Sequence, residues 1–186
     1  MRRILTLAAL LAPGPALAHT GASHLHGFAA GLLHPVGGLD HVPAMVAVGL
    51  WAGLRGGRAA WALPAGFLCA MTAGFGLGAV GVALPLVQAG ILASVIILGA
   101  LVAASARLSL ALAVPLVALF GLLHGQAHGT ELAGLGAVAP AVGFLVATAA
   151  LHGLGVLATR QITNRGVVRL AGGAMAALML AVFGLG

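Results

Sequence analysis

Long apolar runs follow one another along almost the whole chain, and they restrict its fold more than any other feature. Runs of about 20 mainly apolar residues, the length that crosses a bilayer as a helix, lie at roughly 34–54, 61–84, 88–105, 108–127, 135–159 and 166–186. Only 5% of the 186 residues are charged, whereas soluble domains carry about a quarter. Backbone groups in lipid must be paired within their own segment, so these runs predict helices. We therefore expect an all-α polytopic membrane protein with six transmembrane helices.

The first eighteen residues have the pattern of a cleavable secretory signal peptide. Arg2 and Arg3 precede a short apolar run at 4–11, and residues 16–18 form the small-x-small sequence Ala-Leu-Ala. An uncleaved first transmembrane helix is the alternative, but the apolar run is short for a span. The expected organisation is a signal peptide at 1–18, a periplasmic His-containing tail at 19–33 and a six-helix membrane domain at 34–186.

The arginines provide an independent test of the six-span count. If the mature N-terminus lies outside, alternating connections place every Arg of the mature chain on the cytoplasmic side, as the positive-inside rule requires. These residues are Arg55, Arg58, Arg107, Arg160, Arg165 and Arg169. The formal charge of +6 does not indicate nucleic-acid binding, because the Arg occur between apolar runs without a basic stripe. We expect a bacterial inner-membrane protein with both mature termini in the periplasm.

Both acidic residues and four of the eight His fall in two short segments. Ionisable residues are costly in a membrane and therefore indicate function. The segments run from His34 to Met45 and from His124 to Glu131. Their candidate metal ligands are His34, Asp40, His41, His124, His128 and Glu131, with Met45 as a weaker candidate.

The two segments differ in their expected backbone. In the first, Pro35, Pro43 and the Gly37–Gly38 pair make a continuous helix unfavourable, and broken helices are where transporters expose carbonyl groups to ions. In the second, the spacing i, i+4, i+7 places its two His and its Glu on one side of a helix end. Both segments are expected in the outer half of the membrane or at its outer surface.

Imidazole nitrogen combined with carboxylate oxygen is typical of nickel, cobalt, zinc or iron(II) sites. Calcium and magnesium prefer mainly oxygen ligands, so they fit poorly. Further candidates are His19, His24 and His26 in the N-terminal tail, for which an unstructured tail is the alternative to a metal-capture arm. His152 in the fifth run is expected to make a hydrogen bond between helices, and a metal ligand on an exit path is the alternative role.

Two stretches of the sequence resemble a known family. HPVGGLDHVPAMVAVGLWAGL resembles the signature of the HupE/UreJ family of nickel and cobalt permeases, and FGLLHGQAHGTEL is similar to its second motif. The resemblance covers essentially the whole chain. It implies that the six candidates named first handle nickel or cobalt, which is transported and not held as a permanent cofactor. It also implies delivery of the metal to hydrogenase, urease or cobalamin assembly.

The residues and the resemblance together predict a secondary permease, and not an enzyme, that carries the ion from periplasm to cytoplasm. A chain without Lys cannot contain the GxxxxGK[ST] phosphate loop, so ATP hydrolysis by that route is excluded. The expected partners are the ion and the lipid bilayer, and a homo-oligomer stays open. The alternatives are a membrane haem protein with paired His ligands and a zinc metallohydrolase, for which no HExxH motif is present.

Overall fold

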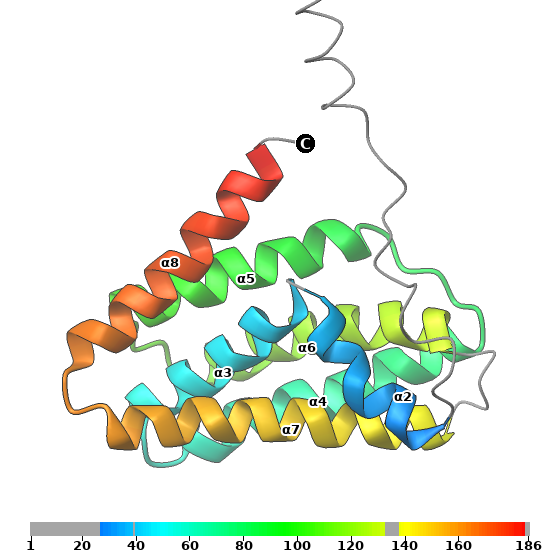
Figure 1. The fold of residues 1–186 in the computed structure, drawn as a ribbon, viewed down its shortest axis with the longest axis horizontal. Helices are drawn as coiled ribbons and strands as arrows, with labels where there is room; N and C mark the ends of the chain where they lie inside the picture. Colours follow the sequence, from blue (N-terminus) through cyan, green and yellow to red (C-terminus); the bar gives the residue numbers. More distant parts are fainter. Residues whose placement is uncertain (1–26, 39, 133–137, 185–186) are drawn as a thin grey trace, which may run out of the picture.

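The computed structural model describes residues 27–38, 40–132 and 138–184. Within these ranges the chain is helical and contains no strand, which confirms the predicted all-α class (Figure 1). The elements are α2 (Phe28–Leu33), the 3₁₀ segment η1 (His34–Gly37), α3 (His41–Arg55), α4 (Ala59–Ala79), α5 (Val87–Ala104), α6 (Leu110–Leu132), α7 (Val138–Gln161) and α8 (Arg165–Gly184).

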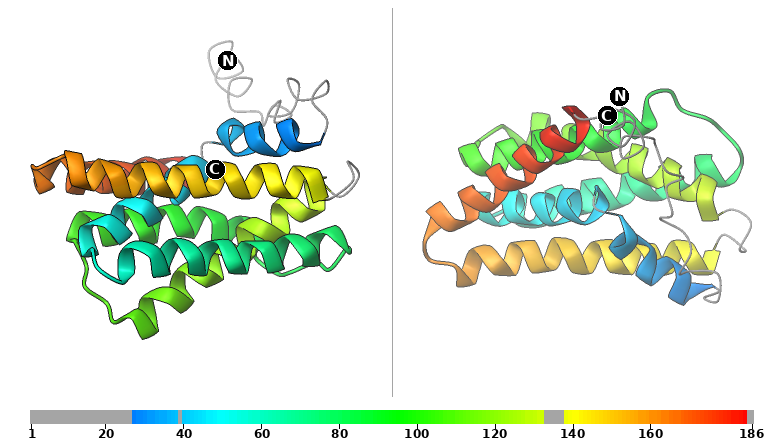
Figure 2. Two further views of the ribbon diagram at one scale, coloured as in Figure 1. Left: turned by 90° about the horizontal axis from the view of Figure 1, so that it is seen from below. Right: turned by 45° about the horizontal axis from the view of Figure 1, so that its top comes forward.

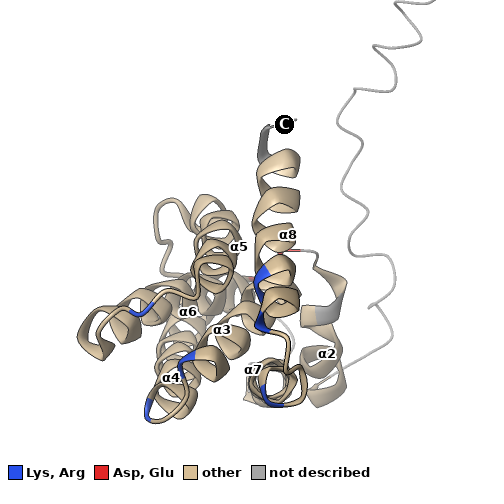
Figure 3. Ribbon diagram, turned by 90° about the vertical axis from the view of Figure 1, so that its left-hand side faces the viewer, with Lys and Arg blue, Asp and Glu red and all other residues tan. Residues whose placement is uncertain are grey.

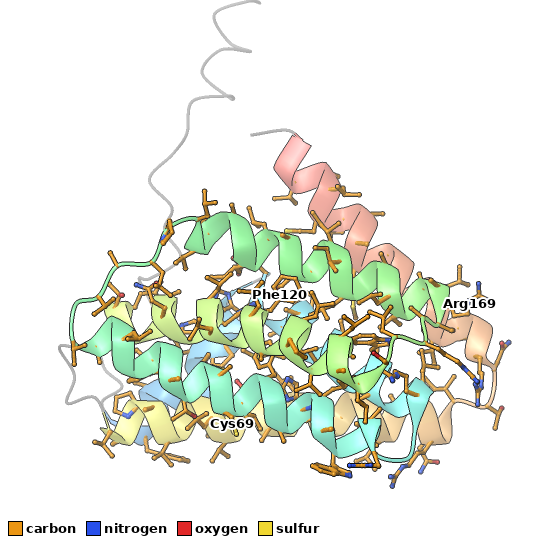
Figure 4. The ribbon with its side chains drawn as sticks, turned by 180° about the vertical axis from the view of Figure 1, so that it is seen from behind. Cys69, Phe120 and Arg169 are labelled. Atoms are coloured by element: carbon orange, nitrogen blue, oxygen red, sulfur yellow. The ribbon has the colours of Figure 1, made fainter. Side chains whose placement is uncertain are left out.

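Five helices, α4 to α8, are long and apolar enough to cross a membrane. Their outward faces carry large apolar side chains such as Leu112, Leu154 and Leu178, each more than half exposed. Figure 4 shows apolar side chains projecting from the outer faces of the bundle. Such a surface is unfavourable in water and suits contact with lipid, because exposed apolar area costs free energy only in an aqueous solvent. The chain is therefore a helical membrane protein.

The first apolar run is a broken helix. The 3₁₀ segment η1 has Pro35 in its first turn and ends at Gly38, whose φ of −111° and ψ of 119° are extended. The helix α3 begins three residues later, and Pro43 lies in its first turn, where a missing N–H costs nothing. The break expected from the Pro and Gly residues is confirmed. Because α3 has only 15 residues, fewer than the roughly 20 of a continuous span, the six-span count stays a prediction.

Residues 28–33, which the sequence assigns to the N-terminal tail, form the helix α2. This helix packs against α7, and Figure 2 shows α7 lying between α2 and the rest of the bundle. The packing is close, because a Cβ at Gly143 of α7 would meet the backbone of Phe28 and Leu32. Helix α2 therefore fixes the position of the chain just before the first segment of candidate ligands, His34 to Met45.

The helices pack in pairs through glycine. Helix α4 packs mainly on α6, α3 on α7, and α5 on α8. At Gly125 of α6, a Cβ would overlap the carbonyl of Met71 and approach the amide nitrogen of Phe75. At Gly49 of α3, a Cβ would overlap the carbonyl of His152. Small residues at such crossings let helix backbones approach closely, as membrane packing favours.

All the described arginines lie at one end of the bundle, as Figure 3 shows. Arg58 and Arg107 lie in connections between helices, and Arg55, Arg160 and Arg165 lie at helix ends. Arg169 lies one turn inside α8, with its Nε donating to the carbonyl of Ala103 at 2.7 Å. The buried Trp51 of α3 donates to the carbonyl of Ala106 at 2.8 Å and ties two helix ends together at this end. We call this end of the bundle the arginine end.

Candidate metal site

Helix α6 carries three of the candidate ligands. The span expected at roughly 108–127 corresponds to α6, which continues to Leu132 and so includes His128 and Glu131. At about 100° per residue, His124, His128 and Glu131 form a narrow stripe about 90° round the helix from the glycines that face α4. The expected alignment of these side chains along one side of a helix is therefore present.

The first residues of α3 meet this stripe. Ligand atoms of His41, His124 and His128 all lie within 4.8 Å of one another. The ring centroids of His41 and His124 are 5.1 Å apart, and those of His41 and His128 are 4.4 Å apart. His124 is fully buried and His128 is 2% exposed. We call these three residues the inner group.

Ser94 and Asp40 determine which ring nitrogens of His124 and His41 carry the lone pair that can bind a metal. The Ser94 hydroxyl donates its single hydrogen to the carbonyl of Ile91 at 2.6 Å, so its oxygen, 3.0 Å from His124 Nε2, can only accept there. The hydrogen of His124 is then on Nε2, and the lone pair is on Nδ1. Similarly, the Asp40 carboxylate accepts from Nδ1 of His41, which leaves the His41 lone pair on Nε2. Neither of these two nitrogens has a hydrogen-bond partner in the described part of the chain.

A second set of ligand atoms lies beside the first. His34 Nε2 is 2.9 Å from Glu131 Oε2, and His128 Nδ1 is 3.4 Å from the same oxygen. The three ligand atoms lie within 4.8 Å of one another. Glu131 is 46% exposed at its side chain and His34 is 16% exposed. We call these residues the outer group, because they are more accessible than the inner group.

His128 belongs to both groups, so the two sites are adjacent and share a ligand. Its ring contacts the rings of His34 and His41, at centroid distances of 4.6 and 4.4 Å. Nitrogen-rich sites with one carboxylate suit nickel, cobalt or zinc, and the exposed-to-buried order suits a site that an ion enters from outside.

The comparison with known proteins assigns the chain to a family. Residues 7–182 match the family described as HupE / UreJ protein. The chain is also 46% identical to Protein HupE of Rhizobium leguminosarum bv. viciae over 175 residues, which is 92% of this chain and 91% of the relative. The chain belongs to the HupE/UreJ family. Members of this family are transporters associated with nickel and cobalt uptake, and not enzymes.

No solved structure matches this HupE/UreJ protein. The structure brings five of the six principal candidates into the two ligand groups, and the sixth, Asp40, lies beside them. Among the described residues, Asp40 contacts His41 and receives a 3.4 Å contact from the Gln88 amide. Its position is that of a group that orients a ligand, as carboxylates beside metal-binding imidazoles commonly do.

Two of the weaker candidates of this HupE/UreJ protein, Met45 and His152, are described by the structure and belong to neither group. Met45 is buried, and its sulfur accepts a 3.3 Å contact from the Thr148 hydroxyl. His152 is 1% exposed, and neither of its nitrogens has a hydrogen-bond partner within the described ranges, so the interhelical hydrogen bond weighed for it is not found there. His19, His24 and His26 lie outside the described residues.

Three residues near the site of this HupE/UreJ protein are missed by the sequence prediction. Two of them lie on α5, where Ser94 contacts His124 and Gln88 contacts Asp40. Both are polar residues in or beside an apolar run, so the rule that polar groups in membranes have a role could have found them. Phe67 of α4 contacts the rings of His124 and His152. A Phe in an apolar span gives no such signal.

The geometry does not favour the haem alternative for this HupE/UreJ protein. Paired axial ligands must stand on opposite faces of a macrocycle, with the haem plane between them. The rings of His34, His41, His124 and His128 instead contact one another, at centroid distances of 4.4 to 5.1 Å. Four mutually packed imidazoles leave no room for a porphyrin, whereas they suit a small cation.

Proposed function

We propose that this chain is a secondary permease for nickel or cobalt that carries the ion from the periplasm to the cytoplasm. The observation that carries the proposal is the sharing of His128 between an exposed and a buried ligand group. Two adjacent sites with a common ligand allow an ion to be passed inward by exchanging one ligand at a time. A protein that only stored or sensed a metal would gain nothing from this second, more accessible set.

The proposed path begins at the outer group. The hydrated ion first meets the exposed carboxylate of Glu131, which attracts it and replaces water together with His34. Rotation about the bond to the His128 ring then brings the ion to the inner group, where lone pairs of His41 and His124 complete its coordination. The burial of His124 and His128 supports an inner site with little access to bulk water, in which nitrogen ligands replace the hydration shell.

The charge distribution supports the proposed direction of transport. Helix α3 begins at the inner group and ends at Arg55, so the ligands lie about 20 Å from the arginine end at 1.5 Å per residue. If the arginine end is cytoplasmic, as the positive-inside rule requires, both groups lie toward the periplasm. The proposed inner-membrane location, the cleaved signal peptide at 1–18 and the periplasmic termini agree with that direction. The ion would then be available to hydrogenase, urease or cobalamin assembly.

The direct test is the uptake of labelled nickel and of labelled cobalt by cells that express the chain. We expect accumulation of at least one of the two metals above the level of cells carrying an empty vector. A Thr72→Val variant is a matched control, because the Thr72 hydroxyl is exposed on α4 and bonds only to the carbonyl of Leu68. Expression at normal membrane levels without accumulation of either metal would contradict the proposal.

Replacing Asp40 by Ala is expected to weaken metal binding by about 10- to 100-fold, the usual cost of losing a group that orients a metal ligand. Without the carboxylate, the His41 ring is free to rotate, and its hydrogen can move to Nε2, which should face the ion. Equilibrium binding to the purified variant measures the effect, with Thr72→Val as the control. Binding as tight as in the wild type would show that Asp40 does not orient His41.

Uptake is expected to weaken as the external pH falls below about 6, because only neutral imidazole binds a metal and free imidazole protonates near pH 6.5. The measurement is the initial uptake rate at fixed free metal. A rate that stays flat between about pH 7.5 and 5.5 would count against imidazole ligation.

A further inference from the structure

His152 is a buried imidazole that the two ligand groups do not use. It lies on α7 and is 1% exposed, and both of its ring nitrogens lack hydrogen-bond partners among the described residues. A buried polar group without a partner is unfavourable, and an ionisable residue within a membrane helix indicates a function. The role expected from the sequence, a hydrogen bond that ties two helices together, does not account for this side chain.

His152 lies deeper in the bundle than the inner group. Its carbonyl packs against Gly49 of α3, where a Cβ would overlap it. Gly49 follows His41 by eight residues, so this level is about 12 Å closer to the arginine end at 1.5 Å per residue. Helices α3 and α7 run in the same direction, because Gly53 packs one turn further on, against Thr159 and Val156.

A single aromatic ring connects the two levels. Phe67 of α4 is fully buried, and its ring centroid lies 5.6 Å from that of His124 and 5.1 Å from that of His152. Among the described residues, His152 is therefore the next imidazole after His124 in the direction of the arginine end. The Phe67 ring lies between the two. An ion that leaves His124 in this direction needs only the Phe67 side chain to move. It then reaches a ring nitrogen of His152 that has no hydrogen-bond partner among the described residues.

The contact between α3 and α7 beside His152 also contains a sulfur atom and a hydroxyl group. The Thr148 hydroxyl, one turn of α7 before His152, is fully buried and donates to the sulfur of Met45 at 3.3 Å. Thr148 and His152 lie on the same face of α7 because they are four residues apart. Sulfur, hydroxyl and imidazole thus follow one another along the contact between α3 and α7, in a core that is otherwise apolar.

We propose that His152 is a further metal-binding station on the permeation path, which receives the ion from the inner group on its way to the arginine end. This inference rests on the proposed function, because an internal station has a use only if an ion passes through the chain. A single strong ligand, assisted by water and by the neighbouring hydroxyl and sulfur, makes a weak site. Weak binding suits a station that an ion must leave again.

The test uses variants of the full chain in which the exposed Cys69, seen on the outer side of α4 in Figure 4, is replaced by Ala. The variants are His152→Ala, His152→Cys and, as a matched control, Gly153→Cys, because nothing lies within 4 Å of a Cβ at Gly153. Membrane levels are matched by an epitope tag. Uptake of labelled cadmium and of the metal that the Cys69→Ala parent accumulates, nickel or cobalt, is then measured.

We expect His152→Ala to lower uptake of the parental metal at least about tenfold, as the loss of a metal-site group commonly does, while equilibrium binding by the purified protein is unchanged. A thiolate is a softer ligand than imidazole, so His152→Cys should raise the ratio of cadmium uptake to uptake of the parental metal. Gly153→Cys should leave that ratio at the parental value. A change in metal preference is a result that a purely structural histidine would not produce.

Two results would overturn the inference while leaving the proposed function intact. One is uptake by His152→Ala at the parental rate. The other is a parental metal ratio in His152→Cys, which would show that residue 152 does not touch the ion. If His152→Ala fails to reach the membrane, His152→Cys decides alone. A parent that accumulates neither nickel nor cobalt would instead remove the proposed function and, with it, the inference.

Discussion

Replacing His128 by Ala is expected to reduce metal uptake to the level of cells without the protein, a loss of at least about 100-fold. His128 is the one described residue present in both ligand groups. Its loss leaves each group with two ligand atoms and also removes the link between the exposed site and the buried one. Initial uptake of the labelled metal, at membrane levels matched by an epitope tag, measures the effect.

The control for this prediction is a pair of variants, each of which removes a ligand from one group only. His34→Ala removes a ligand of the outer group only, and His124→Ala removes a ligand of the inner group only. Each should lower uptake less than His128→Ala does, because each leaves the other group complete. If His128→Ala were no more damaging than His34→Ala, the two groups would not be successive sites on one path.

Replacing Gly125 by Leu is expected to destabilise the folded protein by about 3 kcal/mol or more, the upper range for overpacking a tight interface. Even a Cβ at this position would overlap the carbonyl of Met71, and backbone atoms cannot move aside as a flexible side chain can. Helices α4 and α6 would separate, and the stripe of ligands on α6 would move with them. Thermal unfolding in detergent, followed by circular dichroism, measures the change.

Gly76→Leu is the matched control for this substitution. Gly76 is also a helical glycine, on α4, but nothing lies within 4 Å of a Cβ there. Its melting midpoint should stay close to that of the wild type, since the new side chain meets only lipid or detergent. Equal midpoints for Gly125→Leu and Gly76→Leu would mean that the glycines of α6 are not needed for close packing.

Hydropathy predicts the helices of this chain well because lipid imposes a strong rule on each segment separately. Four of the spans expected from the sequence correspond to α4, α5, α7 and α8 with shifts of a few residues at most ends. The helix α6 extends beyond the expected end of its span. Hydropathy ends this span near residue 127, because His128 and Glu131 are polar, but His128 is buried and Glu131 pairs with His34 and His128. The helix therefore continues through them.

The candidate site is predicted in part, and the reason is physical. Rare ionisable residues in an apolar chain identify the ligands of α6 and of the first segment without any knowledge of their contacts. The convergence of the two segments depends on how α3 and α6 are placed within the bundle, which the pattern of either segment alone does not encode. The roles of Ser94 and Phe67 depend on side-chain geometry alone, which no pattern of spacing encodes.

The most direct test of the central claim is transport by the purified chain in sealed liposomes that contain a metal-sensitive dye. No other protein and no ATP is present, so any entry of metal beyond that into empty liposomes is due to this chain. We predict that nickel or cobalt added outside enters faster than in empty liposomes, and that the His128→Ala variant abolishes the difference. Equal entry with and without the wild-type protein, for both metals, would contradict the account.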